Sequence, residues 1–168
     1  MRQLALVLSI VLAASVNPAG AEVARETYPA PDKALELRVV RTSEGRDLTV
    51  NVLQDQRMVW SRSFGTNTSA KLVVSWSPDS SAVLIVYINA EEGCRLLVVG
   101  IRKERIQPVS AYSADLRDVL SLQPDKVTWE KDGSITLDLE TKTGNARRRI
   151  HWSAHAGMAV VVPVETGK

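Results

Sequence analysis

The sequence has very few of the side chains that most often cross-link a protein or carry out catalysis. Its 168 residues include one cysteine, Cys94, and two histidines. A lone cysteine cannot form an intramolecular disulfide, so the class of small secreted domains held together by disulfides is excluded. We therefore expect packing to provide the stability. The surrounding run GCRLLVVGI is typical of a buried strand and predicts a core thiol; an intermolecular disulfide or a reactive thiol is the alternative.

Long apolar runs are also lacking, apart from one at the N-terminus. Residues 4–14 are apolar, follow Arg2, and are too few to cross a bilayer as a permanent helix. Pro18 and the small residues 19–21 match the end of a secretory signal. We therefore predict that residues 1–21 are a signal peptide and that the protein is periplasmic or secreted. No cysteine follows the cleavage point and no later run is long enough to span a membrane, so we expect neither a lipid anchor nor a transmembrane segment.

Neither sign of charge is in excess. Without Arg2 of the signal, the chain has 20 basic and 19 acidic residues. Such a balance gives no overall electrostatic field that would attract nucleic acid. The predicted export also argues against nucleic acid as a partner. The length suits one domain with a real core. We expect an extended N-terminal arm over residues 22–33, which contains two prolines, followed by a single β domain over residues 34–168.

Familiar catalytic motifs are missing. The chain has no G-x-S-x-G elbow, P-loop, H-E-x-x-H helix or dinucleotide fingerprint. Asp138 and Glu140 are paired carboxylates on one face of a predicted strand, and such pairs can do acid–base work in a cleft. Because no nucleophile or histidine adjoins them in the sequence, we interpret them as a solubilising face. No cofactor is predicted.

Apolar residues alternate with polar ones along most of the chain, as in half-buried strands. The period is two over residues 35–39 and 48–52, which predicts a hairpin. Residues 83–88 and 96–101 are apolar on both faces, so both faces should be covered and these strands should lie at the centre of the domain. Later strands are predicted over residues 126–130, 134–142, 146–153 and 158–164.

One segment, residues 113–122, has the features of a short helix. Ser113 is a suitable N-cap, Asp115 suits the positive end of the helix dipole, and Pro124 prevents continuation. Leu116, Val119 and Leu120 would form one apolar stripe. We expect this helix to close one end of the β core.

An internal repeat connects two parts of the chain. The run VSWSPDSSAVLIVY, from Val74, aligns without gaps with VTWEKDGSITLDLE, from Val127. Valine, tryptophan, aspartate and serine coincide, and both runs read as strand, four-residue turn, strand. The offset is close to that of propeller blades. We interpret residues 71–101 and 124–153 as a structural pseudo-repeat.

The first copy, Trp76-Ser77-Pro78-Asp79-Ser80, resembles the W-S-P-D-G signature of bacterial PD40-type propeller repeats, as in TolB-type periplasmic proteins. The resemblance covers roughly residues 71–101 and implies blade-like architecture and a protein-binding scaffold. A closed propeller needs at least four blades, and this length allows two to three. The expected fold is all-β with one short helix: an antiparallel two-sheet sandwich or propeller-blade-like sheets, not a closed propeller.

Two histidines are weak candidates for a metal site. On a continuous strand His151, Ser153 and His155 would point the same way. Two histidines on one face could hold a metal if a third ligand joined them, but none is visible nearby in the sequence. The alternative is a pair of solvated histidines at a strand end.

The basic run at residues 147–149 is the candidate for partner binding. Arg147 and Arg149 would share one strand face and could bind phosphate, anionic lipid or an acidic partner. The alternative is a charged edge strand that resists aggregation. Trp152 and Trp60 lie in more polar strands and could be exposed contact anchors or core residues.

Together these patterns predict an exported, non-enzymatic β domain that binds or scaffolds an envelope protein. A small-molecule or metal-binding periplasmic protein is the second possibility, and an enzyme of unknown class is the third. Nucleic acid is not an expected partner, and the sequence does not determine the oligomeric state.

Overall fold

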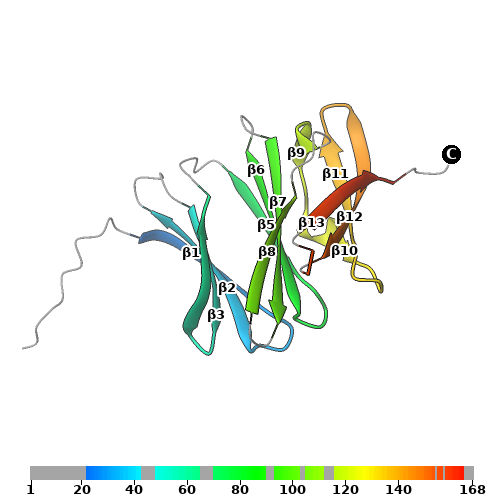
Figure 1. The fold of residues 1–168 in the computed structure, drawn as a ribbon. Coiled ribbons are helices and arrows are strands. Elements are labelled where there is room, and N and C mark those ends of the chain that lie inside the picture. The colour runs from blue at the N-terminus through cyan, green and yellow to red at the C-terminus, as the bar shows by residue number, and fades with distance from the viewer. Residues whose placement is uncertain are drawn as a thin grey trace, which may run out of the picture.

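Three antiparallel sheets make up the protein (Figure 1). The structure is a computed structural model that describes residues 22–42, 48–64, 70–89, 93–102, 105–111, 116–153, 155–156 and 158–164. The first sheet contains β1 (Glu22–Pro29), β2 (Leu35–Thr42), β3 (Leu48–Gln54) and β4 (Arg57–Ser63). The second contains β5 (Lys71–Trp76), β6 (Ala82–Asn89), β7 (Gly93–Arg102) and β8 (Arg105–Ala111). The third contains β9 (Val119–Ser121), β10 (Val127–Trp129), β11 (Ile135–Thr141), β12 (Gly144–Ser153) and β13 (Met158–Pro163), with a 3₁₀ turn, η2, at Pro124–Lys126.

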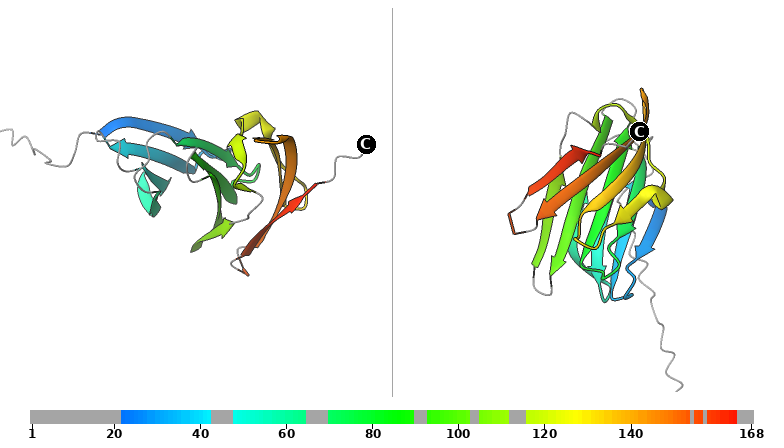
Figure 2. Two further views of the ribbon diagram at one scale, coloured as in Figure 1. Left: turned by 90° about the horizontal axis from the view of Figure 1, so that it is seen from above. Right: turned by 90° about the vertical axis from the view of Figure 1, so that its right-hand side faces the viewer.

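The first two sheets are meanders of consecutive strands, and the third is a meander of β10 to β13 in which β9 also pairs with β11. The three sheets stand in a row with the second between the other two (Figures 1 and 2). Every strand pair within them is antiparallel. Across the described residues the sheets do not close into a ring. The all-β prediction is confirmed, and the described residues form three antiparallel sheets where a sandwich of two sheets was one of the expected forms.

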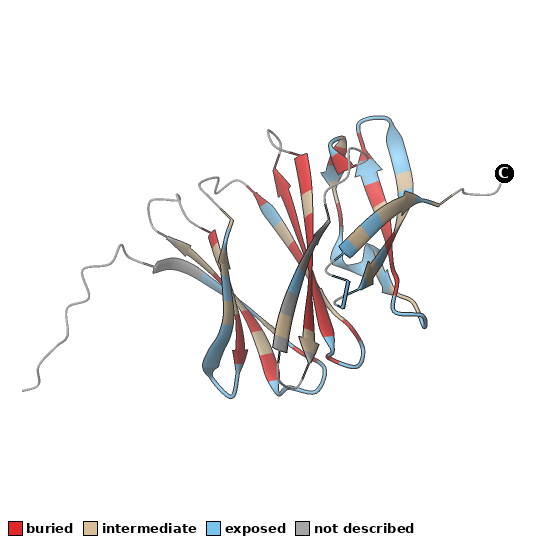
Figure 3. Ribbon diagram, viewed as in Figure 1, coloured by how far each residue is buried: buried red, intermediate tan, exposed pale blue. Residues whose placement is uncertain are grey.

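The second sheet forms the centre because strand β6 is buried along its whole length. Successive side chains of a strand point to opposite faces. Val83, Ile85 and Tyr87 therefore pack in the cluster shared with the first sheet, whereas Leu84 and Val86 pack in the cluster shared with the third. The prediction that strands apolar on both faces lie at the centre is confirmed (Figure 3).

A turn built around an aspartate recurs once in each sheet. The residue after the aspartate has a left-handed backbone, and the amide one residue further on donates to the carboxylate. This geometry connects the first two strands of the first two sheets, and β10 to β11 in the third. The aspartates are Asp32, Asp79 and Asp132, their amide donors are Ala34 at 3.0 Å, Ser81 at 3.1 Å and Ser134 at 2.9 Å, and the left-handed residues are Lys33, Ser80 and Gly133.

Hydrogen bonds between neighbouring turns and strands hold the sheets in place. The indole Nε1 of Trp76 in β5 donates to the carbonyl of Tyr28 in β1 at 3.0 Å. The indole of Trp129 in β10 likewise donates to Ser75 Oγ in β5 at 3.0 Å. The aligned tryptophans of the two sequence copies therefore play equivalent roles. Each donates a hydrogen bond from the strand before its aspartate turn to the first strand of the preceding sheet.

The segment expected as an N-terminal arm is part of the first sheet. Residues Glu22–Pro29 form β1, which pairs with β2 in a register that places Tyr28 opposite Leu37. The arm prediction was wrong because a strand at the edge of a sheet can be polar. An edge strand pairs with only one neighbouring strand and buries only part of one face. Residues 30–33 then form the aspartate turn of the first sheet.

The predicted helix over residues 113–122 is also wrong in its described part. Val119–Ser121 is strand β9, which pairs with the end of β11. Leu116, Val119 and Leu122 are all buried in the cluster between the second and third sheets. Their three-residue spacing resembles a helical stripe, but tertiary pairing with β11 determines the conformation. Residues 113–115 lie outside the described residues.

Two glycines with the same backbone angle provide a matched test of packing. Gly93 has φ +82°, and a Cβ there would lie 3.2 Å from the backbone of Arg117. Gly133 has φ +81°, and nothing lies within 4 Å of its Cβ position. We predict that Gly133→Ala lowers the free energy of unfolding by about 1 kcal/mol from backbone strain alone. Gly93→Ala should lower it by about 3 kcal/mol, because a clash is added. Urea denaturation checks this, and equal losses would contradict the packing.

The aspartate turns also predict a dependence of stability on pH. Hydrogen bonds from Ser77 and Ser81 hold the pKa of Asp79 below its ordinary value. The carboxyl of the unfolded chain has a pKa of about 3.9, so the stabilisation is full above that pH and is lost as pH falls through the lower folded pKa. Asp79→Asn keeps an acceptor but cannot titrate. We expect its stability deficit at pH 6 to shrink at pH 3 in urea denaturation; a constant deficit would be the contrary result.

Candidate functional site

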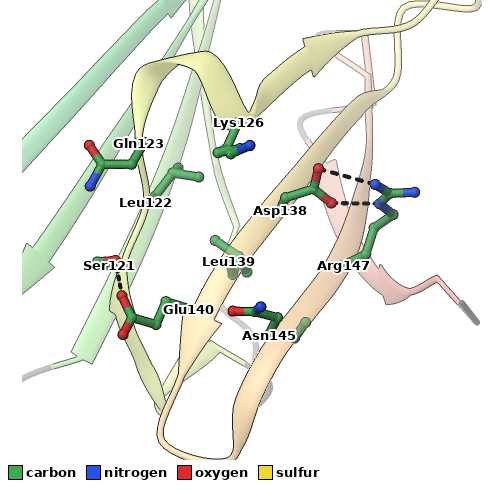
Figure 4. Close-up of a pocket in the computed structure, with 10 residues that line it drawn as sticks. Ser121, Leu122, Gln123, Lys126, Asp138, Leu139, Glu140, Asn145 and Arg147 are labelled. Atoms are coloured by element: carbon green, nitrogen blue, oxygen red, sulfur yellow. Dashed lines mark hydrogen bonds and ion pairs between the residues drawn. The ribbon is translucent and has the colours of Figure 1, made fainter.

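A groove of about 470 Å³ lies on the face of the third sheet that is turned away from the second sheet. We call this face the outer face. The segment from β9 to η2 forms one wall, and β11 with β12 forms the other (Figure 4). The polar side chains that line the groove are Ser121, Gln123, Lys126, Asp138, Glu140, Asn145 and Arg147.

A salt bridge fixes the wall formed by β11 and β12. Asp138 and Arg147 are directly opposite in the strand register. The guanidinium of Arg147 donates from Nε at 2.5 Å and from Nη2 at 3.1 Å to the two carboxylate oxygens of Asp138. These hydrogen bonds lower the pKa of Asp138 and raise the pKa of Arg147. Both side chains therefore keep their charges at neutral pH.

The second carboxylate of the groove is tied to the opposite wall. Ser121 of β9 donates to Glu140 Oε2 at 2.6 Å, and the two residues are opposite in the pairing of β9 with β11. A general acid needs a proton at working pH, which requires a raised pKa. Asp138 has the reverse shift. Of the carboxylate pair that the sequence offered as an acid–base candidate, Glu140 therefore joins the two walls of the groove, and Asp138 fixes the wall formed by β11 and β12.

Two amide side chains are left with free hydrogen-bonding groups. Gln123 and Asn145 are exposed at the groove, and within the described part of the chain neither forms a side-chain hydrogen bond. They come from a loop and from the start of β12, at separate positions in the sequence. Sequence analysis missed both residues because no local pattern marks amides that only the fold brings to one groove.

The basic run occupies an interior strand. β12 has β11 on one side and β13 on the other, so the charged-edge interpretation was wrong. Arg147 and Arg149 do share the outer face, but only Arg147 lines the groove. Arg149 lines a neighbouring recess of about 340 Å³ with Glu130, Lys131 and Asp132. Its Nε is buried and has no hydrogen-bond partner among the described residues.

The two tryptophans proposed as exposed anchors are half-buried and belong to the interfaces between sheets. Trp60 packs against the cluster between the first and second sheets. Trp152 packs against the cluster between the second and third, and its Nε1 donates to the carbonyl of Gly133 at 2.9 Å. The core interpretation fits both residues, and their replacement is expected to disturb packing.

The histidines do not share a strand. His151 lies on the outer face of β12, opposite Val160 of β13, whereas β12 ends at Ser153 and His155 lies in the turn that follows. The alternation that would align them therefore stops before His155. Among the residues that the structure describes, no three His, Cys, Asp or Glu side chains gather closely enough to hold a metal ion.

An exposed apolar stripe on β13 was not anticipated from the sequence. Met158 is 59% exposed and Val160 is 48% exposed. Their register partners in β12 are Ser153 and His151, which places the stripe on the outer face with Arg149 and the groove. The period-two alternation of β13 is hidden in the sequence because both its faces carry apolar residues.

Comparison of the chain with family models, with curated proteins and with solved structures gave no match. The resemblance to PD40-type repeats therefore stays a prediction. The predicted signal peptide, residues 1–21, lies outside the described residues. In the described part of the chain, no helix has the length and apolar character needed to span a membrane.

Cys94 gives a direct test of the core interpretation. The thiol is 8% exposed and free, and burial raises its pKa to about 12. Only the thiolate reacts readily, so we expect negligible labelling by a disulfide-exchange reagent at pH 8 in the native protein and full labelling in urea. Gly93→Ala should accelerate the native reaction because it loosens the adjacent turn. Rapid labelling of the native wild type would rule out a core thiol.

Proposed function

We propose that the protein is an exported, non-enzymatic binding module that holds an extended segment of an envelope protein in the groove of the third sheet. The observation that carries this proposal is the pair of free amides, Gln123 and Asn145, one on each wall of the groove, beside carboxylates that already have partners. Export, and with it a periplasmic location, is supported by the N-terminal sequence.

The chemistry of the groove favours a polypeptide. A primary amide has both a donor and an acceptor, which is what the N–H and C=O groups of an extended backbone need. Main-chain hydrogen bonds supply affinity in this mode of recognition, and side-chain contacts supply specificity. The groove is open to solvent, and seven of its ten lining residues have polar side chains.

The surrounding structure supports binding without rearrangement. The bidentate contact of Arg147 with Asp138 and the hydrogen bond from Ser121 to Glu140 hold both walls before any partner arrives. A preorganised surface loses little conformational entropy on association. The stripe of Met158 and Val160 on the same face offers apolar contact area to a partner that extends beyond the groove.

The three aspartate turns support a place for the chain among PD40-type repeats. Asp32 and Asp79 are 47 residues apart, and Asp79 and Asp132 are 53 apart. These separations are close to the length of a propeller blade. Such blades present rigid surfaces, and a site on rigid strands is held more accurately than a site on loops.

A crosslinking experiment tests the proposed function. The protein, tagged after Lys168, is treated with an amine-reactive crosslinker in the native envelope, and the Lys126 amine at the groove reports contact with a partner. We expect one stoichiometric envelope protein, joined to Lys126 through an identifiable peptide. Replacing Gln123 and Asn145 together by alanine should reduce its yield about tenfold, the effect of losing two ordinary hydrogen bonds.

The matched control removes the same two side-chain types from strand β3 of the first sheet, far from the groove in the fold. The double variant Asn51→Ala with Gln54→Ala should leave the yield of the crosslinked partner unchanged. A partner that is retained by the groove variant, or crosslinks that all map away from Lys126, would overturn the proposal. Recovery of the protein alone would do so as well and would direct attention to ligands at His151 and His155.

A further inference from the structure

A separate recess lies between the second and third sheets, at the end where the β6–β7 hairpin turns. It has a volume of about 220 Å³. Lys71, Arg117 and Lys142 line it, together with Asn89, Gly93 and the exposed side chain of Leu120. No carboxylate belongs to its described lining, so positive charge is gathered here from three different parts of the chain.

Backbone contacts place each of the three basic residues. Lys71 begins β5 and is held opposite Ile88 of β6. The amide of Lys142 donates to the carbonyl of Asp118 at 3.0 Å, which joins the β11–β12 turn to the segment that contains Arg117. Arg117 in turn lies against Gly93, so closely that a Cβ at Gly93 would be 3.3 Å from the Arg117 carbonyl oxygen. The convergence is therefore built into the fold.

Among the described residues, the three basic side chains have no anionic partner. Within the described residues none of them forms an ion pair or a side-chain hydrogen bond. In the groove, by contrast, Arg147 is paired with Asp138 and Lys126 lies 4.0 Å from Asp125. Like charges that share a site repel one another, and a bound anion removes that repulsion. Residues 90–92 lie outside the described residues.

We infer that this recess binds a compact phosphate-type oxyanion, either a free anion or the headgroup of an anionic lipid. Lysine and arginine are the side chains that recognise phosphate oxygens, through charge-assisted hydrogen bonds. The volume is below the range of drug-sized ligands, which suits one tetrahedral anion with its water. Asn89 is only 2% exposed and adds a fixed polar group to the wall. The inference does not depend on the proposed peptide groove.

The first test is a titration of the purified protein with inorganic phosphate, followed by amide chemical shifts at constant ionic strength with chloride as the reference anion. We expect saturable shifts confined to the amides of Gly93, Arg117, Leu120 and Lys142. Each single change, Lys71→Gln, Arg117→Gln or Lys142→Gln, should weaken binding by about two- to fivefold, as expected for exposed charges. The triple variant should abolish binding.

The matched control is Lys131→Gln, which removes an exposed lysine from the β10–β11 turn and should leave phosphate binding unchanged. Sedimentation with phosphatidylglycerol vesicles, compared with phosphatidylcholine vesicles, separates the two sources of the anion. Sedimentation that is lost in the triple variant identifies a lipid headgroup, and phosphate binding without sedimentation identifies a free anion. Absence of saturable shifts in the wild type, or shifts that persist in the triple variant, would overturn the inference.

Discussion

The structure depends on the burial of strand β6 on both of its faces. Because side chains alternate along a strand, Ile85 and Tyr87 join the cluster with the first sheet, and Leu84 and Val86 join the cluster with the third. One strand thus contributes to both cores, and each outer sheet needs only one apolar face. Without β6 the outer sheets would have no common partner.

The free faces of both outer sheets carry charge pairs. On the first sheet, Arg38 pairs with Glu36 at 2.8 Å on the face away from the core. On the third, Arg147 pairs with Asp138. Covering such a face with a further sheet would desolvate charges whose attraction repays little of that cost. Terminal units of repeat proteins have polar outer faces for the same reason. The three sheets therefore stand as one unit in the described residues.

Local patterns in the sequence predicted the strands well. They predicted poorly which residues from distant parts of the chain the fold brings together. The double-sided apolar run at residues 83–88 identified the central strand. The alignment paired Trp76 with Trp129, which make equivalent hydrogen bonds in the structure, although the alignment itself predicted no such bonds. The turn at Asp32 escaped notice because its hairpin lacks the tryptophan, although Pro31 and Asp32 occupy the same places as Pro78 and Asp79. The groove at Gln123 and Asn145 could not be predicted, since only the pairing of β9 with β11 brings its walls together.

The short β9 strand has the largest effect on the surface. By pairing with the end of β11, it carries Ser121 to Glu140 and so closes one wall of the groove. The same pairing draws the preceding segment over the β6–β7 turn, where Gly93 leaves room for the backbone of Arg117. A helix at this position would have filled the end of the core and produced neither recess. Buried Leu116, Val119 and Leu122 anchor the segment, and its polar neighbours are thereby positioned on the two surfaces. Core packing of these three side chains thus fixes the positions of the exposed groups beside them.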